Sequence, residues 1–178
     1  KPLSKPRKTA CSSMVQICPM PTFPISGSFH LRRGRRSIPS QLYLVTTITP
    51  QRKPHFLNTE LARTTVRSMS SVDLWFPSHC LCWVLMPDHW HGLIELGAGK
   101  SLSSTMQRVK GATARIVGQS CTFDGSLWDK GFHDHALRRD ESIEKAARYI
   151  IANPVRAGLV GDPMDYPYWD AWFLDGES

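Results

Sequence analysis

The stretch Leu81–Leu96 constrains the fold most, because it holds two β-rich runs joined by a two-residue turn. The runs are Leu81–Met86 and His89–Leu96, and Pro87-Asp88 forms the turn. Turn residues between such runs are typical of a β-hairpin. A two-residue turn fixes the register, and the expected cross-strand pairs are Met86 with His89, Val84 with His91, Cys82 with Leu93 and Cys80 with Glu95.

Strand and helix patterns alternate on both sides of this hairpin. The alternation over Leu42–Ile48 predicts a strand that precedes it. Two helices are expected, each with an N-cap side chain and an apolar stripe. Asn58 begins the first, with the stripe Leu61, Thr65, Met69 and Val72; Ser101 begins the second, with the stripe Leu102, Met106, Val109, Thr113 and Ile116.

The last elements complete a known arrangement. A short strand is expected near His133–Arg138, and Asp140 and Glu141 favour the start of a helix that ends at Pro154. The order β-α-β-β-α-β followed by one more helix matches the ferredoxin-like split β-α-β motif. We therefore expect an α+β fold with an antiparallel sheet. The strand His89–Leu96 lies at its centre, two helices cover one face, and the last helix is free to lie on the other.

Composition and charge narrow the class of protein. With 41% hydrophobic and 21% charged residues among 178, the chain is not wholly disordered. No apolar run approaches the length of a transmembrane helix. Five cysteines without a dense framework predict a reducing compartment, so we expect a cytoplasmic protein without membrane attachment.

The positive charge is concentrated near the N-terminus. Residues 1–38 carry eight basic residues and no acid, whereas residues 39–178 carry 14 basic and 15 acidic residues. Residues 1–33 also lack a sustained apolar period, and we interpret them as a flexible basic leader. Such an arm either binds nucleic acid by neutralising phosphates or is a solvated tail.

His89-Trp90-His91 is the sharpest local motif. Side chains two apart on a strand point to the same face, so both imidazoles project together and Trp90 points to the opposite face. Two convergent imidazoles form half of a divalent-metal site, although a structural pair of histidines is the alternative.

A zinc site that joins the histidines to Cys80 and Cys82 is excluded by distance. Cys80 lies about 13 Å along the sheet from His91 at about 3.3 Å per residue. A zinc ion with ligand bonds of about 2.0–2.3 Å cannot join them, so Cys80 and Cys82 are expected to pack.

The segment His133-Asp134-His135 is a second histidine pair on an expected strand. It could supply metal ligands or contact DNA. The alternative is a polar edge strand in which Asp134 pairs with a neighbouring cation. The sequence does not decide between these, and the pair stays unassigned.

The helix from Glu141 to Asn153 places a tyrosine beside an asparagine. The expected apolar stripe of this helix holds Ile143, Ala147, Ile150 and Ile151. Tyr149 lies at its flank, and Asn153 lies four residues later on the same face. Taken alone, Tyr149 is typical of a residue at the edge of the core, and an asparagine before proline such as Asn153 is typical of a turn or a helix cap. A free phenol, with a pKa of about 10, is a poor nucleophile. A divalent ion that polarises a phosphoryl oxygen would make the phosphorus easier to attack. The Asn153 oxygen is a plausible third ligand beside the histidines for Mg²⁺ or Mn²⁺.

Three motifs, in this order, resemble one known family. WVLMPDHWHGLIEL (83–96), GFHDHALRRDE (131–141) and ARYIIANPVRAGLV (147–160) are similar to the REP-associated tyrosine transposases. These are single-tyrosine members of the HUH (His-hydrophobic-His) endonuclease superfamily. The resemblance covers about residues 34–172, assigns residues 34–178 to one such domain, and departs at Ser40, where the family commonly has glycine.

The resemblance implies a metal-dependent endonuclease and transesterase that nicks and rejoins single-stranded DNA near hairpin-forming palindromic repeats. His89 and His91 would bind Mg²⁺ or Mn²⁺ with Asn153, and Tyr149 would form a 5′-phosphotyrosine. Expected DNA contacts are Arg138, Arg139 and Arg156. The family suggests a monomer at the nucleoid, with a dimer as the alternative.

Two other functions are compatible with the residues. One is a non-catalytic nucleic-acid-binding module with an open ferredoxin-like or RRM-like sheet, which needs stacking aromatic residues on its central strands. The other is a metal-dependent hydrolase that uses an activated water. A covalent protein–DNA adduct separates both from the transesterase.

Overall fold

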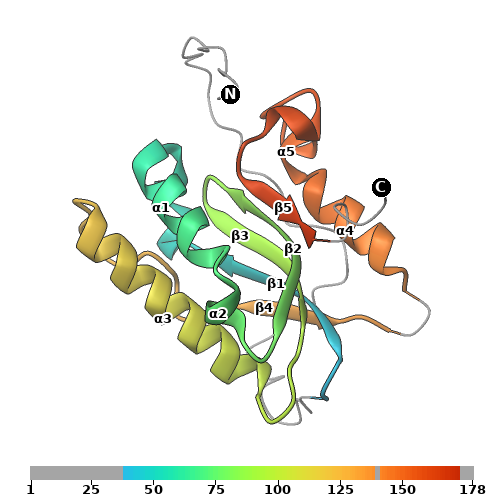
Figure 1. Ribbon diagram of the computed structural model, residues 1–178. Helices are drawn as coiled ribbons and strands as arrows, with labels where there is room; N and C mark the ends of the chain where they lie inside the picture. The colour runs from blue at the N-terminus through green and yellow to red at the C-terminus, as the bar shows by residue number, and fades with distance from the viewer. Residues whose placement is uncertain (1–37, 139–140, 173–178) are drawn as a thin grey trace, which may run out of the picture.

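An antiparallel sheet of five strands organises the computed structural model, which describes residues 38–138 and 141–172 (Figure 1). The strand order is β4-β1-β3-β2-β5. This order confirms the α+β fold class and the central place of β3. The strands are β1 (Leu42–Ile48), β2 (His79–Met86), β3 (His89–Glu95), β4 (His133–Ala136) and β5 (Trp169–Ala171).

Helices α1 (Thr59–Met69), α2 (Val72–Trp75) and α3 (Leu102–Ser120) lie on one face of the sheet (Figure 1). Both predicted N-caps are present: the Asn58 side chain accepts from Glu60 N and Leu61 N, and Ser101 forms a capping box with Ser104. Trp90 is fully buried on this side and stacks on Trp75, with ring centroids 5.6 Å apart.

The prediction that Val72 extends the stripe of the first helix is wrong. Helix α1 ends at Met69, and the extended backbone at Ser71 (φ −71, ψ 121) separates it from α2. Val72 therefore begins a new helix and is 73% exposed. On α3, Val117 takes the buried position, while Ile116 is only partly buried.

Helices α4 (Ile143–Ile151) and α5 (Asn153–Arg156) lie on the other face (Figure 1). Ala147 and Ile150 are fully buried there, above Leu44, Val84 and Leu93 of the sheet. Two details differ from expectation. Ile143 is 44% exposed, so it lies outside the apolar stripe. Pro154 does not end the long helix, which stops at Ile151; instead it occupies the first turn of α5, where a missing N–H costs nothing.

The β2–β3 register confirms three of the four predicted pairs: Met86 with His89, Val84 with His91, and Cys82 with Leu93. The fourth is wrong. A bulge between Cys80 and Cys82 shifts the ladder by one residue, so Cys80 faces Ile94 and His79 faces Glu95. As a result Cys80 packs with the α1–α3 side and Cys82 with the α4 side. Burial raises the pKa of Cys82 to about 12, in keeping with a packing role.

Two further expectations concern the leader and membrane-spanning helices. The leader 1–33 lies outside the described residues, so the domain boundary at residue 34 stays a prediction. Among residues 38–138 and 141–172, every helix falls short of the length and hydropathy needed to cross a bilayer.

Candidate active site

Both histidines of the His-x-His motif project from β3 toward the α4 face. His89 is 3% exposed and His91 is 4% exposed, whereas Trp90 between them points beneath α1 and α3. The period of two along a strand causes this division, as predicted. The central strand therefore presents two nearly buried imidazoles on the face that carries the tyrosine helix.

The hydrogen bonds of His91 define its chemical form. Its Nδ1 lies 3.1 Å from the Val45 carbonyl oxygen and 2.6 Å from the Thr46 hydroxyl. A carbonyl oxygen only accepts, so Nδ1 carries the proton and Nε2 keeps its lone pair. Nε2 is buried and has no hydrogen-bond partner among the residues that the structure describes. Burial first, and then the charges of His89 and Arg156, lower the pKa of His91 to about 3 despite its bond to Val45. The ring is neutral at pH 7, the form that binds metals.

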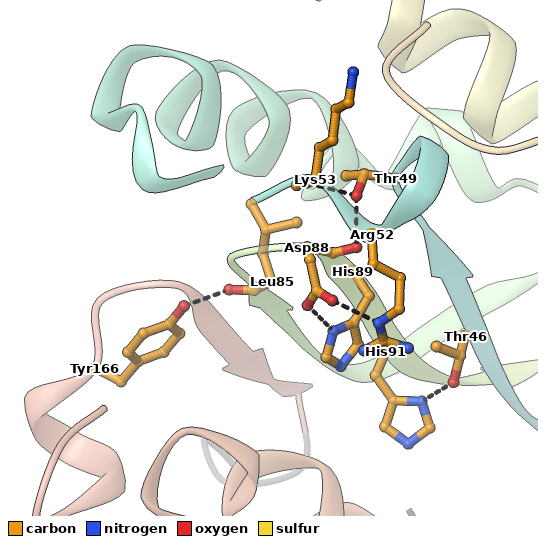
Figure 2. A network of polar contacts seen from close by, with 9 residues as sticks. All are labelled: Thr46, Thr49, Arg52, Lys53, Leu85, Asp88, His89, His91 and Tyr166. Carbon is orange, nitrogen blue, oxygen red and sulfur yellow. Dashed lines mark hydrogen bonds and ion pairs between the residues drawn. The ribbon is translucent and has the colours of Figure 1, made fainter. Parts of the chain in front are cut away.

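His89 is held by an acidic neighbour in the hairpin turn (Figure 2). Its Nδ1 lies 2.7 Å from Asp88 Oδ1, and Asp88 Oδ2 accepts a 2.8 Å bond from Arg52 Nε. Burial alone would raise the pKa of Asp88, but the hydrogen bond from His89 and the charges of His89 and Arg52 lower it overall. Asp88 is thus an ionised carboxylate between two donors.

Tyr149 meets His91 across the gap between α4 and β3. The two rings are edge-on, with centroids 6.4 Å apart and planes at 77°. Arg156 on α5 lies over the tyrosine ring, and its Nη2 donates a 3.1 Å hydrogen bond to the phenolic oxygen. The sequence predicted Tyr149 and His91 to converge, and the structure brings them together. It also adds Arg156, which had been expected only as a DNA contact.

The chain has three other tyrosines, and each has different surroundings. Tyr43 is buried on the α1–α3 side of the sheet. The Tyr166 hydroxyl donates a 2.7 Å hydrogen bond to the Leu85 carbonyl, and burial raises its pKa. Tyr168 packs edge-on against Tyr166, at 5.8 Å between centroids. Tyr149 is the tyrosine whose ring packs against a motif histidine.

Asn153 is 1% exposed at the start of α5. Its side-chain nitrogen donates to the carbonyl oxygens of Tyr149 at 3.2 Å and Ile150 at 3.0 Å. The side chain therefore caps the last turn of α4, as its position before proline indicated. These bonds occupy the amide nitrogen and leave the amide oxygen as the atom that could bind a metal.

The remaining predicted residues surround β4, an edge strand paired with β1. His133 faces Thr46, and the Nε2 of His135 lies 3.1 Å from both carboxylate oxygens of Glu141. Arg138 is exposed after the strand, and its backbone N–H donates to Glu141 at 2.6 Å. Arg139 lies outside the described residues. Strand β4 is thus an edge strand with polar side chains; the pairing of Asp134 with a cation and the DNA contacts of Arg138 and Arg139 stay predictions.

The donor set suits a hard divalent ion only if an oxygen ligand joins the imidazoles. Within the described part of the chain, His, Cys, Asp and Glu side chains form no group of three or more that could hold a metal. The Nε2 of His91 is nonetheless a buried lone pair without a partner in residues 38–138 and 141–172, and a metal ion would satisfy it. The two histidines with the Asn153 oxygen, water and substrate would fit Mg²⁺ or Mn²⁺.

Comparison with known proteins places this site in a family. The family model described as "Transposase IS200 like" matches residues 39–153, which include both histidines, Tyr149 and Asn153. The chain belongs to this transposase family. The REP-associated tyrosine transposase of Escherichia coli (strain K12) is 28% identical over 93 residues, which are 52% of this chain and 53% of that protein. A second relative, from Haemophilus influenzae, is 24% identical over 103 residues, 58% of its length.

The chain therefore spans a little over half of the length of the curated relatives it matches. A solved structure of a REP-associated tyrosine transposase bound to a REP hairpin has the same fold. Its TM-score is 0.61 at 24% identity, and the match covers 76% of this chain and 79% of that one. The predicted resemblance to the REP-associated tyrosine transposases is confirmed.

Proposed function

We propose that the protein is a metal-dependent single-stranded DNA endonuclease and transesterase that nicks and rejoins DNA at hairpin-forming repeats. The packing of the Tyr149 ring against His91 carries the proposal, because the Nε2 of His91 is buried and has no partner in the described part of the chain. Membership of a transposase family and likeness to a hairpin-bound transposase support DNA as the substrate. In this proposal the protein acts as a monomer at the nucleoid in the cytoplasm.

Tyr149 is the nucleophile of the proposed reaction. Its oxygen attacks the scissile phosphorus, a tyrosine O–P bond forms, and the bond from phosphorus to the 3′ oxygen breaks. The phenolic proton leaves to solvent and the 3′ oxygen gains a proton, so the products are a 5′-phosphotyrosine and a free 3′-hydroxyl. Attack of a 3′-hydroxyl on the phosphotyrosine reverses these steps. The strand is rejoined without ATP, because a phosphodiester is exchanged for another phosphodiester.

Arg156 supports this attack in two ways. Its guanidinium donates to the phenolic oxygen at 3.1 Å, which orients the nucleophile. Its positive charge also lies where negative charge develops between the attacking oxygen and the phosphate.

His89, His91 and the oxygen of Asn153 would hold Mg²⁺ or Mn²⁺. When bound, such an ion polarises a phosphoryl oxygen and stabilises the leaving oxygen. The neutral, Nδ1-protonated form of His91 is already the form that such a ligand needs. Arg138 and Arg139 are proposed to position the DNA backbone.

The RRM-like alternative receives less support. An RRM-like module needs an open sheet face with stacking aromatic residues. In this fold α4 covers the central strands on the histidine face, where Leu44, Val84 and Leu93 are buried. Trp90, the aromatic residue of the motif, is fully buried on the other side.

Incubation with single-stranded DNA hairpins and Mn²⁺ or Mg²⁺ tests the proposal. We expect a protein–DNA adduct that survives a denaturing gel, is lost when the metal is chelated, and is absent from His91→Ala and Tyr149→Phe. Tyr168→Phe is the matched control, because it removes one phenolic hydroxyl from a side chain that packs against the core on the α1–α3 side. Cleaved DNA without a linkage would indicate a hydrolase, and binding without cleavage would indicate a binding module; either result overturns the proposal.

A further inference from the structure

Asp88 occupies the tip of the β2–β3 hairpin and is fixed by its backbone. Its carbonyl oxygen accepts from Thr49 N at 2.9 Å and lies 3.0 Å from the Thr49 hydroxyl (Figure 2). The neighbouring Pro87 carbonyl accepts from Phe56 N at 3.0 Å. The segment after β1 therefore wraps around the hairpin tip, and these bonds hold the backbone of Pro87 and Asp88 in place.

Both carboxylate oxygens of Asp88 form hydrogen bonds with side chains. Oδ1 lies 2.7 Å from His89 Nδ1, and Oδ2 accepts from Arg52 Nε at 2.8 Å. The side chain of Asp88 is 8% exposed and that of Arg52 is 23% exposed, so solvent screens this pair less than a surface ion pair. The three side chains form a chain in the order Arg52, Asp88, His89.

The backbone that carries Arg52 is held in an uncommon conformation. Gln51 and Arg52 in η2 (Pro50–Arg52) have φ values of 55° and 53°, the left-handed region that side chains other than glycine rarely adopt. The Thr49 hydroxyl also lies 2.7 Å from the Lys53 carbonyl, across this turn. Such backbone costs free energy and persists where the surrounding contacts hold it. Here it delivers the Arg52 guanidinium to the carboxylate behind His89.

We infer that Asp88 and Arg52 are positioning residues of the active site: Asp88 accepts the Nδ1 proton of His89, so that Nε2 presents its lone pair, and Arg52 orients the carboxylate. The inference rests on the proposed metal-binding role of His89. A carboxylate behind a ligand histidine fixes its tautomer and ring orientation. The Arg52–Asp88 pair holds the Nδ1 proton of His89, as the Val45 carbonyl holds the Nδ1 proton of His91.

The substitution Asp88→Asn separates positioning from simple anchoring. Arg52 Nε is a donor, so it would hold the amide oxygen and turn the amide NH₂ toward His89. The ring would then need to accept at Nδ1 and carry its proton on Nε2, which removes the ligand lone pair. We expect imidazole ¹⁵N NMR of the metal-free protein, in mildly alkaline buffer where a free imidazole is neutral, to show this inverted tautomer. We also expect Mn²⁺ affinity, from the EPR signal of free Mn²⁺, to fall roughly 10- to 100-fold.

Removal of Arg52 from the Asp88→Asn variant should restore the original tautomer of His89. In the double variant Arg52→Met, Asp88→Asn the amide can rotate its oxygen to His89, so we expect the original tautomer and most of the Mn²⁺ affinity to return. Arg52→Met alone should keep the tautomer and weaken Mn²⁺ binding several-fold. Glu144→Gln, which alters an exposed pair with Arg148, is the control and should change neither readout.

A wild-type tautomer and unchanged Mn²⁺ affinity in Asp88→Asn would overturn the inference and leave an ion pair that only anchors the turn. Should Asp88→Asn fail to fold, Arg52→Met still decides the arginine's part, because unchanged Mn²⁺ affinity would contradict it. The tautomer is measured without metal or DNA. A protein that forms no DNA adduct would thus refute the proposed function while the inference is still judged separately.

Discussion

Arg156 lies across the ring of Tyr149, with its guanidinium carbon 4.1 Å from the ring centroid and its Nη2 3.1 Å from the phenolic oxygen. The two residues come from consecutive helices, α4 and α5, joined at Ala152. The buried Asn153 side chain bonds the last carbonyls of α4 at this joint. The short helix α5, with Pro154 in its first turn, thus places the Arg156 guanidinium beside the tyrosine.

Replacement of Arg156 should slow formation of the adduct. We expect Arg156→Gln to lower the single-turnover rate at saturating DNA about 10²-fold, since one donor to developing negative charge is lost. Arg156→Lys should recover part of the rate, because a lysine keeps the charge but not the planar donor geometry. Arg148→Gln, an exposed arginine on α4, is the matched control. Equal rates in wild type and Arg156→Gln would show that the arginine only packs on the ring.

Two substitutions of Asn153 should separate its role as a helix cap from its proposed role as a metal ligand. Asn153→Ala and Asn153→Asp both lose the donor to the Tyr149 and Ile150 carbonyls, so each should lower the free energy of unfolding by about 1 kcal/mol or more. Asn153→Asp keeps a side-chain oxygen, so only Asn153→Ala should also lose Mn²⁺ affinity. Urea unfolding and Mn²⁺ titration measure the two effects. Wild-type Mn²⁺ affinity in both variants would assign Asn153 to capping alone.

Gly92 makes room for the indole of Trp90. A Cβ at position 92 would collide with that ring and approach the Cys82 carbonyl oxygen to 3.0 Å. Trp90 is fully buried and stacks on Trp75, so a shift of its indole would disturb the core. We expect Gly92→Ala to destabilise the fold by about 1–3 kcal/mol in urea unfolding. Gly111→Ala in α3, where a Cβ meets open space, should instead stabilise it by up to about 1 kcal/mol. The same sign for both variants would contradict this packing.

Ser40 occupies a backbone position that favours glycine. Its φ is 60°, and its N–H bonds the Leu96 carbonyl at 2.8 Å, next to the start of β1. This conformation is one that glycine adopts without steric cost. We expect Ser40→Gly to raise the free energy of unfolding by about 0.5 kcal/mol and Ser40→Val to lower it by about 1 kcal/mol or more. A stability order with valine above glycine would refute the assigned conformation.

Much of the site could be predicted because short-range rules determine it. Strand periodicity places His89 and His91 together, and the two-residue turn sets their partners Met86 and Val84. The tyrosine helix reaches His91 because the ferredoxin-like order leaves that face for the last helix. These conclusions need only spacing, turn length and element order.

The rest depends on contacts between distant segments. The bulge between Cys80 and Cys82 arises within a regular apolar run, so no local signal marks it. The Arg52–Asp88 pair requires two left-handed residues at Gln51 and Arg52, neither of which is glycine. Strand β5 has three residues, too few for a periodic pattern. Only the folded chain shows that η2 reaches the hairpin tip.

Identification of the residue that carries the DNA tests the central claim most directly. Trypsin cleaves after Arg148 and Arg156 and so releases residues 149–156, a peptide with a single tyrosine. After incubation with hairpin DNA and Mn²⁺, nuclease trimming and mass spectrometry, this peptide should carry a 5′-linked nucleotide on Tyr149. A nucleotide on Tyr43, Tyr166 or Tyr168 instead, or cleaved DNA with no modified peptide, would contradict the account.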